Sequence, residues 1–264
     1  MIKSTFNKQK KILYFLIFGF ALIRGQLVDE SFTYSDGNLV GNGTWVNFSG
    51  TSGQIQVSSG IITLTDTNSE DARVTFPAQN SGMIYYGFDI IVSDPGSYSG
   101  NDFEYFCGFA DNTTFENRVD IAAFSASGWK PGISNLSSTA EATWETYLDY
   151  ATTYRILVGL NIGTGISDLW VNPSNTSSTK ITGTGSQNVN EIDAFFLRQS
   201  NGTPNITLTM DNLVVSTDFD ESLPVELTSF IATPQKGAIE LSWVTESEID
   251  NLGFLIDRSL EPNS

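Results

Sequence analysis

Alternation of apolar and polar residues with a period of two constrains this chain more than any other feature. Three long stretches show it, at residues 84–92, 154–162 and 206–214. Successive side chains of a β-strand point to opposite faces, so each stretch predicts a strand with one buried face. Shorter candidates alternate with runs rich in Gly, Ser, Asn and Asp, and no βαβ spacing occurs. The chain is therefore predicted to be all-β, as an antiparallel sandwich or barrel.

The chain has 264 residues, which allows one large or two small domains. It contains no histidine, so Ser-His and Cys-His nucleophile pairs and His-ligated zinc or haem are excluded. Catalysis would have to rest on carboxylates, Tyr, Lys, Ser or a hard cation. One segment, 139–150, fits a short helix and an irregular strand edge equally well.

The only cysteine, Cys107, rules out a disulfide within the chain. Strand alternation places Phe103, Tyr105, Cys107 and Phe109 on one face. Cysteine on an apolar strand face packs as a small hydrophobic residue. We therefore predict a buried thiol, and a fold that depends on its core for stability.

Residues 1–25 have the pattern of a secretory signal peptide. Lys3, Lys8, Lys10 and Lys11 precede an apolar run at 12–23. That run is shorter than the ~20 residues of a membrane-spanning helix. We expect cleavage after Gly25, no stable membrane insertion afterwards, and a secreted or outer-surface protein; an uncleaved N-terminal anchor is the alternative.

The charge balance excludes one large class of partners. Five of the 13 basic residues and none of the 30 acidic residues lie within residues 1–25, so the remainder carries 8 basic and 30 acidic residues, a formal net charge of −22. A field of this sign repels phosphate backbones, and nucleic-acid binding is not expected. Acidic extracellular proteins commonly bind Ca²⁺, which makes a calcium ion the candidate cofactor, although acidity also serves solubility.

The composition changes at 221–224, and three further strand candidates follow at 225–230, 238–243 and 253–259. They resemble the first strands of an immunoglobulin-like or fibronectin-like domain, with Trp243 in its core. Such a domain needs about seven strands. The predicted organisation is a signal peptide at 1–25, a sandwich at 26–220 and a partial Ig-like domain at 221–264. We expect the natural protein to continue beyond Ser264; a complete protein with a frayed tail is the alternative.

Four stretches in the sandwich carry a family resemblance: 152–158, 168–173, 196–199 and 210–217. Their succession resembles the concanavalin A-like (laminin G-like) jelly-roll modules of secreted bacterial multidomain proteins. That resemblance implies a two-sheet jelly roll in which the first and last strands pair. It also implies a fold shared by carbohydrate-binding modules, adhesive modules and glycosidases, among which fold alone does not choose.

The C-terminal stretch carries a second resemblance, through residues 223–230, 243–248 and 253–254. It is similar to the domain that precedes the sorting signal in bacterial type IX secretion cargo. The resemblance implies export by that secretion machinery and attachment at, or release from, the cell surface.

Four charged residues form the first candidate ligand site. Asp102 and Glu104, two residues apart, are expected on one strand face with Phe106, and Arg118 and Asp120 are expected to face them from the next strand. This arrangement suits a carboxylate pair or a cation site. An exposed polar strand face explains it equally.

Two further residues are candidates. Trp129 lies in an apparent loop, where its ring suits stacking on a sugar, or alternatively plugs one end of the sandwich. Asp211 precedes the closing strand residues and is a candidate metal ligand, with a structural hydrogen bond to a nearby turn as the alternative.

One motif invites an enzymatic interpretation. Glu191 and Asp193 resemble the start of the E-[apolar]-D-x-x-E signature of laminarinase-like glycoside hydrolases, but Phe195 and Phe196 stand where the second catalytic carboxylate belongs. The predicted function is a non-catalytic module that binds an extracellular glycan or mediates adhesion. The alternatives are a glycosidase or polysaccharide lyase using Asp102, Glu104 or Tyr residues, and a structural spacer.

Overall fold

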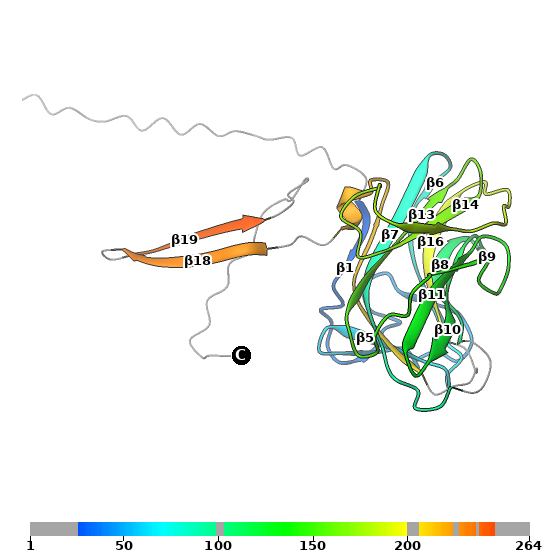
Figure 1. Cartoon of the computed structure of the whole chain (residues 1–264), viewed down its shortest axis with the longest axis horizontal. Coiled ribbons are helices and arrows are strands. Elements are labelled where there is room, and N and C mark those ends of the chain that lie inside the picture. The colour runs from blue at the N-terminus through cyan, green and yellow to red at the C-terminus, as the bar shows by residue number, and fades with distance from the viewer. Residues whose placement is uncertain (1–25, 99–102, 200–205, 224–226, 236–237, 246–264) are drawn as a thin grey trace, which may run out of the picture.

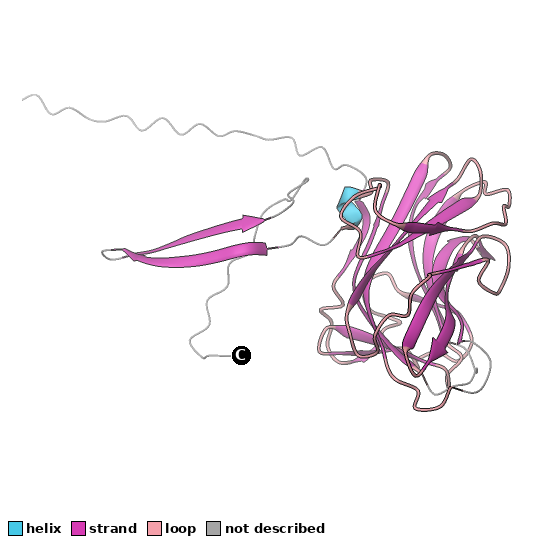
Figure 2. Ribbon diagram, in the orientation of Figure 1, coloured by secondary structure: helices cyan, strands magenta, loops and turns pink. Residues whose placement is uncertain are grey.

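The computed structural model describes residues 26–98, 103–199, 206–223, 227–235 and 238–245. Within these ranges the chain forms two large antiparallel sheets that pack face to face, a separate hairpin, and a single turn of 3-10 helix (Figures 1 and 2). The predicted antiparallel two-sheet jelly-roll sandwich is therefore confirmed. The segment 139–150 contains a two-residue strand and no helix.

Sheet A has nine strands in the described residues, in the order β15-β14-β13-β7-β17-β5-β4-β2, with β1 also paired to β17. Their bounds are β1 Gln26–Glu30, β2 Gly37–Asn38, β4 Gln56–Ser58, β5 Ile61–Thr65, β7 Met83–Val92, β13 Tyr154–Asn161, β14 Ile166–Val171, β15 Lys180–Thr182 and β17 Thr207–Ser216. The first and last strands of the sandwich are thus neighbours, as the jelly-roll resemblance implied.

Sheet B has eight strands in the same ranges, in the order β12-β11-β10-β8-β16-β6-β3, with β9 also paired to β8. Their bounds are β3 Val46–Ser49, β6 Asp71–Gln79, β8 Phe103–Asp111, β9 Thr114–Phe115, β10 Arg118–Ser125, β11 Gly128–Ser134, β12 Ala142–Thr143 and β16 Ile192–Arg198.

The core between the sheets is rich in aromatic rings. Tyr86 on β7 of sheet A meets Phe109 and Phe195 of sheet B edge to face, with ring centroids 4.6 and 5.1 Å apart. The inward side chains of β7 alternate as predicted and are fully buried. Cys107 is also buried in this core, which confirms the prediction of a buried thiol.

Two bulges correct the predicted alternation. In β17 the pairing with β7 shifts between Asp211 and Val214, and Asn212 adopts a positive φ of 51°. Leu213 therefore enters the core, whereas the sequence pattern placed Asn212 inside. Asparagine tolerates this left-handed conformation better than most residues, which explains why the strand breaks its alternation there.

The second bulge lies in β8, where the pairing with β10 shifts between Val119 and Ile121. Phe106 and Cys107 both enter the core, and Tyr105 joins a different cluster on the outer face of sheet B. The predicted face shared by Tyr105 and Cys107 is therefore wrong. One irregular position in a strand reverses the direction of every side chain beyond it.

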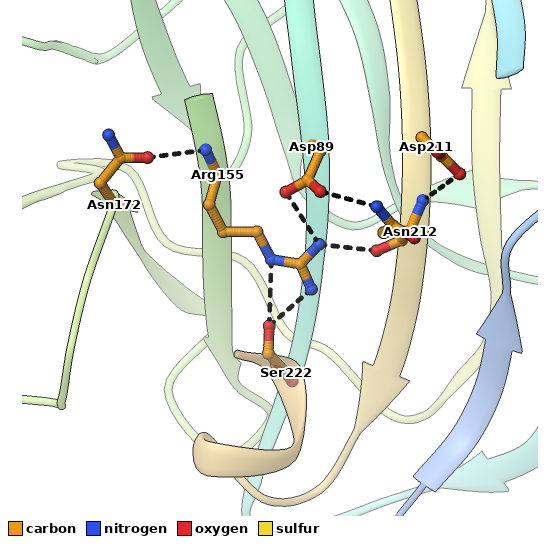
Figure 3. A network of polar contacts seen from close by, with 6 residues as sticks. All are labelled: Asp89, Arg155, Asn172, Asp211, Asn212 and Ser222. Atoms are coloured by element: carbon orange, nitrogen blue, oxygen red, sulfur yellow. Dashed lines mark hydrogen bonds and ion pairs between the residues drawn. The ribbon is translucent and has the colours of Figure 1, made fainter. Parts of the chain in front are cut away.

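A buried arginine fastens the end of the sandwich to sheet A (Figure 3). Arg155 on β13 donates from Nε and Nη2 to the Ser222 carbonyl oxygen, at 3.3 and 2.7 Å. It also donates from Nη1 to the Asn212 carbonyl at 2.6 Å and reaches Asp89 at 3.4 Å. Ser222 belongs to the 3-10 turn η1, Asp220–Ser222. The guanidinium group thus joins strands β7, β13 and β17 to the segment that leaves the sandwich.

The same exit segment covers part of the outer face of sheet A with apolar side chains. Phe219 contacts Tyr85 and Trp170 edge to face, at 5.6 and 5.2 Å. Leu223 packs against this cluster as well. The packed chain therefore extends slightly beyond the predicted boundary at residue 220.

The C-terminal strands form a hairpin, β18 (Leu227–Gln235) with β19 (Ala238–Thr245). These two strands match two of the three predicted there, and the third, at 253–259, lies outside the described residues. An immunoglobulin-like domain in this region stays a prediction, as does the signal peptide at 1–25. Among the described residues, none of the helical structure has the length and apolarity that crossing a bilayer requires.

We predict that Gly87→Ala destabilises the sandwich by about 1–3 kcal/mol, because any side chain there displaces Arg155 from its hydrogen bonds to the Ser222 carbonyl oxygen. A Cβ at Gly87 would lie 2.5 Å from the Ser222 carbonyl oxygen and 2.9 Å from Arg155 Nη2. Urea unfolding of the purified protein measures the change.

The matched control is Gly163→Ala, since a Cβ there meets only Asn161 Oδ1, at 3.4 Å. We expect its free energy of unfolding to stay within about 0.5 kcal/mol of the wild-type value. Equal stability of the two variants would contradict a stabilising role for the contact between Arg155 and Ser222.

Candidate functional site

The outer face of sheet B carries a second aromatic cluster, separate from the core. Phe196 on β16 is fully buried, and Phe115 on β9 lies over it with a centroid distance of 4.2 Å and an interplanar angle of 25°. Phe48 and Tyr105 stand edge-on to Phe115, at 5.4 and 5.7 Å. Both of these rings and Phe115 itself are partly exposed. The result is a flat phenyl ring bordered by two upright ones.

Three arginines lie against these rings. Arg73 on β6 lies 4.7 Å from the centroid of Phe48, and Arg198 on β16 lies 4.3 Å from that of Tyr105. Arg118 on β10 contacts Tyr105 at 5.3 Å and Phe115 at 5.7 Å. A guanidinium group over a ring face is attracted by the ring quadrupole. We call these seven residues, Phe48, Arg73, Tyr105, Phe115, Arg118, Phe196 and Arg198, the arginine–aromatic patch.

The backbone around the patch leaves room for the rings. Gly108 lies opposite Phe196 in the pairing of β8 with β16. A Cβ at Gly108 would lie 3.0 Å from the Phe196 ring and 2.1 Å from the Asn117 carbonyl oxygen. Gln187 then ties the turn after Phe115 in place, because its Nε2 donates to the Glu116 carbonyl at 2.6 Å and to Glu116 Oε2 at 2.7 Å.

Glu116 is the buried acid beside this patch, with 4% of its surface exposed. Burial raises the pKa of Glu116 from 4.5 to about 7; the Asp111 carboxylate raises it further, and Arg118 opposes the shift. The carboxyl group is therefore partly protonated near neutral pH. Its neutral form suits the buried position, whereas its ionised form is disfavoured by the loss of hydration.

Other polar groups border the patch. Asp193 on β16 accepts a hydrogen bond from the Asn112 backbone N–H at 3.0 Å, and Arg73 Nη1 donates to the Asn112 carbonyl oxygen. Asp71 on β6 accepts from the Ser49 hydroxyl at 2.5 Å. Donors and acceptors thus surround the rings, which is the combination that recognises a polyhydroxylated ligand.

The predicted ligand-site residues are only partly brought together. Arg118 belongs to the patch, whereas Asp120 is 3% exposed and does not offer its carboxylate at the surface. Phe106, predicted on the same face as these two, lies in the core. Asp102 falls outside the described residues; Glu104 lies in β8, with its side chain outside the description.

Trp129 does not lie in an open loop, and its proposed stacking on a sugar is corrected. It is the second residue of β11, just after a tight turn, and is fully buried, with its ring 6.3 Å from that of Tyr154. Hydrogen bonds between the backbones of Trp129 and Leu148 hold the neighbouring segment over it. The alternative, a plug at one end of the sandwich, fits this position.

Asp211 lies on the outer face of sheet A, directly opposite Asp89. Its Oδ1 accepts the Asn212 N–H at 2.7 Å, and Asn212 Nδ2 donates to Asp89 at 2.8 Å (Figure 3). Burial raises the pKa of Asp211, and the Asp89 carboxylate adds to the rise. Asp211 thus accepts a structural hydrogen bond, although from the adjacent residue in the bulge of β17 rather than from the nearby turn that the alternative named.

A pocket of about 160 Å³ lies beside these two acids, lined also by Ile61, Ile91, Thr153, Thr209, Met210 and Asn212. Across the described parts of the chain, no three His, Cys, Asp or Glu residues are grouped to hold a metal ion. The calcium expectation gains no support from this arrangement, because a carboxylate pair with Arg155 beside it provides too few oxygen ligands.

Comparison with known proteins finds solved structures with a similar fold. No protein-family model matches the chain, and no curated protein matches it. A solved sialidase structure superimposes with a TM-score of 0.52 at 13% identity over 76% of this chain, and the match spans 19% of the sialidase chain. At this identity the likeness shows the two-sheet sandwich fold.

Two further structures align less closely. Peanut lectin gives a TM-score of 0.47 at 16% identity, covering 72% of this chain and 96% of the lectin. The CBM2 module of the evolved Dit protein of Lactobacillus casei BL23 phage J-1 gives 0.47 at 9% identity, covering 74% and 97%.

Sequence reasoning missed most of the patch. Phe48, Arg73, Phe115 and Arg198 were not singled out, and Phe196 entered only as a substitute for a catalytic acid. One signal was present: Phe195 and Phe196 are adjacent on a strand, so one of them has to point away from the core. Nothing in the sequence shows that Phe115 is the residue that covers it.

We predict that Glu116→Gln stabilises the protein at pH 8 and changes little at pH 4.5. The raised pKa means that wild-type stability falls as the pH rises from about 4.5 through about 7, since the folded state resists ionising this group. The expected difference at pH 8 is about 1–3 kcal/mol. Urea unfolding of both proteins across this range measures it.

Other carboxylates titrate in both proteins and cancel in the comparison. A wild-type protein as stable as the variant at pH 8 would show that Glu116 ionises without cost.

Proposed function

We propose that the chain is a carbohydrate-binding module and that the arginine–aromatic patch is its binding surface. The observation that carries this proposal is the set of rings: Phe115 lies flat on buried Phe196 while Tyr105 and Phe48 border it edge-on. A sugar ring presents C–H groups that pack on such an aromatic face.

The polar groups of the patch supply the other half of sugar recognition. Arg73, Arg118 and Arg198 bring guanidinium donors to the rings, and Asp193, which accepts from the Asn112 N–H, is a carboxylate near Arg73. Hydroxyl groups of a saccharide both donate and accept hydrogen bonds, so they suit this mixture. The net charge of −22 over residues 26–264 argues against a nucleic acid as the ligand.

Binding without catalysis is the form of the proposal that the residues support. The hydrolase-like run beginning at Glu191 has Phe196 in place of its last carboxylate, and Phe196 lies beneath Phe115. Asp193 accepts a backbone hydrogen bond from Asn112. A retaining or inverting glycosidase needs two carboxyl groups that flank the scissile bond.

The cellular context is part of the same proposal. The lysines and apolar run of residues 1–25 support export, and the β18–β19 hairpin supports a further β domain after the sandwich. The resemblance of residues 223–254 to type IX secretion cargo supports display at, or release from, a bacterial cell surface. If the patch binds no saccharide, the remaining alternative is a structural spacer.

We predict that the protein binds at least one polysaccharide and that Tyr105→Ala weakens this binding about tenfold or more, equivalent to about 1.4 kcal/mol. The substitution removes the ring that borders Phe115 and supports Arg118 and Arg198. A panel of neutral and acidic polysaccharides, followed by calorimetric titration of the best binder, measures the effect.

Tyr147→Ala is the matched control, because Tyr147 is an exposed tyrosine that also contacts a cation, Lys130, away from the patch. It is expected to bind like the wild type. Two results would sink the proposal: no binding to any polysaccharide, or equal binding by wild type and Tyr105→Ala. Sugar release from any substrate would instead support the enzymatic alternative.

A further inference from the structure

The guanidinium group of Arg118 lacks a hydrogen-bond acceptor within the described part of the chain. Its Nε and Nη1 atoms are buried without a partner, and no ion pair to it occurs among those residues. Arginine has five N–H donors, and buried donors are satisfied in nearly all native structures. An acceptor for Arg118 therefore has to come from outside the described residues.

Arg155 provides an internal comparison. Its guanidinium group is saturated by the Ser222 and Asn212 carbonyl oxygens and by Asp89, which is the pattern of a structural arginine (Figure 3). Arg118 shows the opposite pattern, with aromatic contacts and no hydrogen bonds. The two residues belong to one chain and one fold, so the difference reflects their positions rather than a general shortage of acceptors.

Arg118 is nevertheless held in place. The rings of Tyr105 and Phe115 pack against it, and its neighbour Val119 is anchored in the core. Its side chain is partly exposed, and Nη2, unlike Nε and Nη1, is not among the buried unpaired atoms, so Nη2 is the atom that a ligand can approach. Arg73, on the other side of the patch, also has a buried Nε without a partner. Arg118 thus lies against Phe115, whereas Arg73 lies against Phe48 and donates from Nη1 to the Asn112 carbonyl oxygen.

The Glu116 carboxyl group does not fully neutralise Arg118. Glu116 interacts with it electrostatically, but Glu116 Oε2 accepts its hydrogen bond from Gln187. Burial raises the pKa of Glu116 to about 7, which keeps part of this group neutral at physiological pH. A cation held rigid by rings, with no carboxylate hydrogen-bonded to it among the described residues, is suited to an anionic group of a ligand.

We propose that the ligand of the patch is an acidic saccharide, whose carboxylate or sulfate oxygens bind Arg118. This inference rests on the proposed glycan-binding function and names its substrate class. The sugar ring packs on Phe115, and its anionic substituent accepts the donors that the protein leaves unused. Neutral saccharides bind the rings but lack that acceptor, so they bind less tightly.

The test compares matched short saccharides by calorimetric titration with the full chain. The probes are uronate oligosaccharides, the same oligosaccharides with their carboxyl groups reduced to alcohols, and sulfated and unsulfated forms of one neutral oligosaccharide. At least one acidic probe is expected to bind tenfold or more tightly than its uncharged counterpart. The uronate and sulfate arms distinguish the two sources of negative charge.

Substitutions of Arg118 test whether this residue is responsible for the preference for acidic saccharides. Arg118→Gln is expected to weaken the acidic probe about 10- to 100-fold, the range for a charge-assisted hydrogen bond, and to change neutral binding less than threefold. Arg118→Lys keeps the charge and loses the planar fork, so it is expected to fall between the two. Lys180→Gln removes the same charge from sheet A, where Lys180 pairs with Asp168, and serves as the control.

Each outcome bears on the inference. Equal binding of acidic and uncharged probes overturns it while leaving glycan binding intact, as does an Arg118→Gln variant that binds acidic probes like the wild type. Equal weakening by Arg118→Gln and Lys180→Gln also overturns it, because the effect would then be one of net charge. Failure of every saccharide to bind removes the proposed function and the inference together.

Discussion

The aromatic contact between the two sheets is the interaction on which the rest of this structure depends. Tyr86 of sheet A meets Phe109 and Phe195 of sheet B, and Phe88 stacks beside it, 6.2 Å away. A chain with a single cysteine forms no disulfide of its own, so burial of apolar surface has to hold the sheets together. Once the sheets are paired in this way, their outer faces are free to differ.

The two outer faces are used differently. On sheet A, Arg155 and Phe219 fasten the segment that leaves the sandwich, and the polar groups there are bonded to one another. On sheet B, aromatic residues appear on the outside as well as the inside of β8 and β16. Phe195 and Tyr105 illustrate this, the first in the core and the second in the patch. The outer rings of sheet A, Tyr85 and Trp170, are covered by Phe219, whereas Phe48, Tyr105 and Phe115 on sheet B stay partly exposed.

Much of the fold follows from the sequence, because strand alternation is a local property. The inward residues of β7 agree with the alternation, and the pairing of β1 with β17 agrees with what the family resemblance implies. The bulges at Asn212 and near Tyr105 do not follow from it, since a bulge depends on how the neighbouring strand pairs. Trp129 follows a two-residue turn, Ala126 and Ser127, and the glycines and proline around it in sequence are typical of a loop although they lie in β11.

The candidate site was harder to predict for a related reason. Arg118 was identified, but its partners were expected among nearby acids rather than rings. The contact of Phe115 with Phe196 joins residues far apart in the chain, and the contact of Arg73 with Phe48 crosses between two strands. Only the order of strands in sheet B brings them together, and alternation alone does not specify that order.

The central claim is that ligand binding occurs on the outer face of sheet B. The most direct measurement is a residue-resolved NMR titration of the protein with its best-binding saccharide. Chemical-shift changes are expected to be concentrated at Phe48, Tyr105, Phe115 and Arg118. The residues of the pocket beside Asp89 and Asp211 are expected to show no change. Shifts centred on that pocket, with the patch residues unmoved, would contradict it.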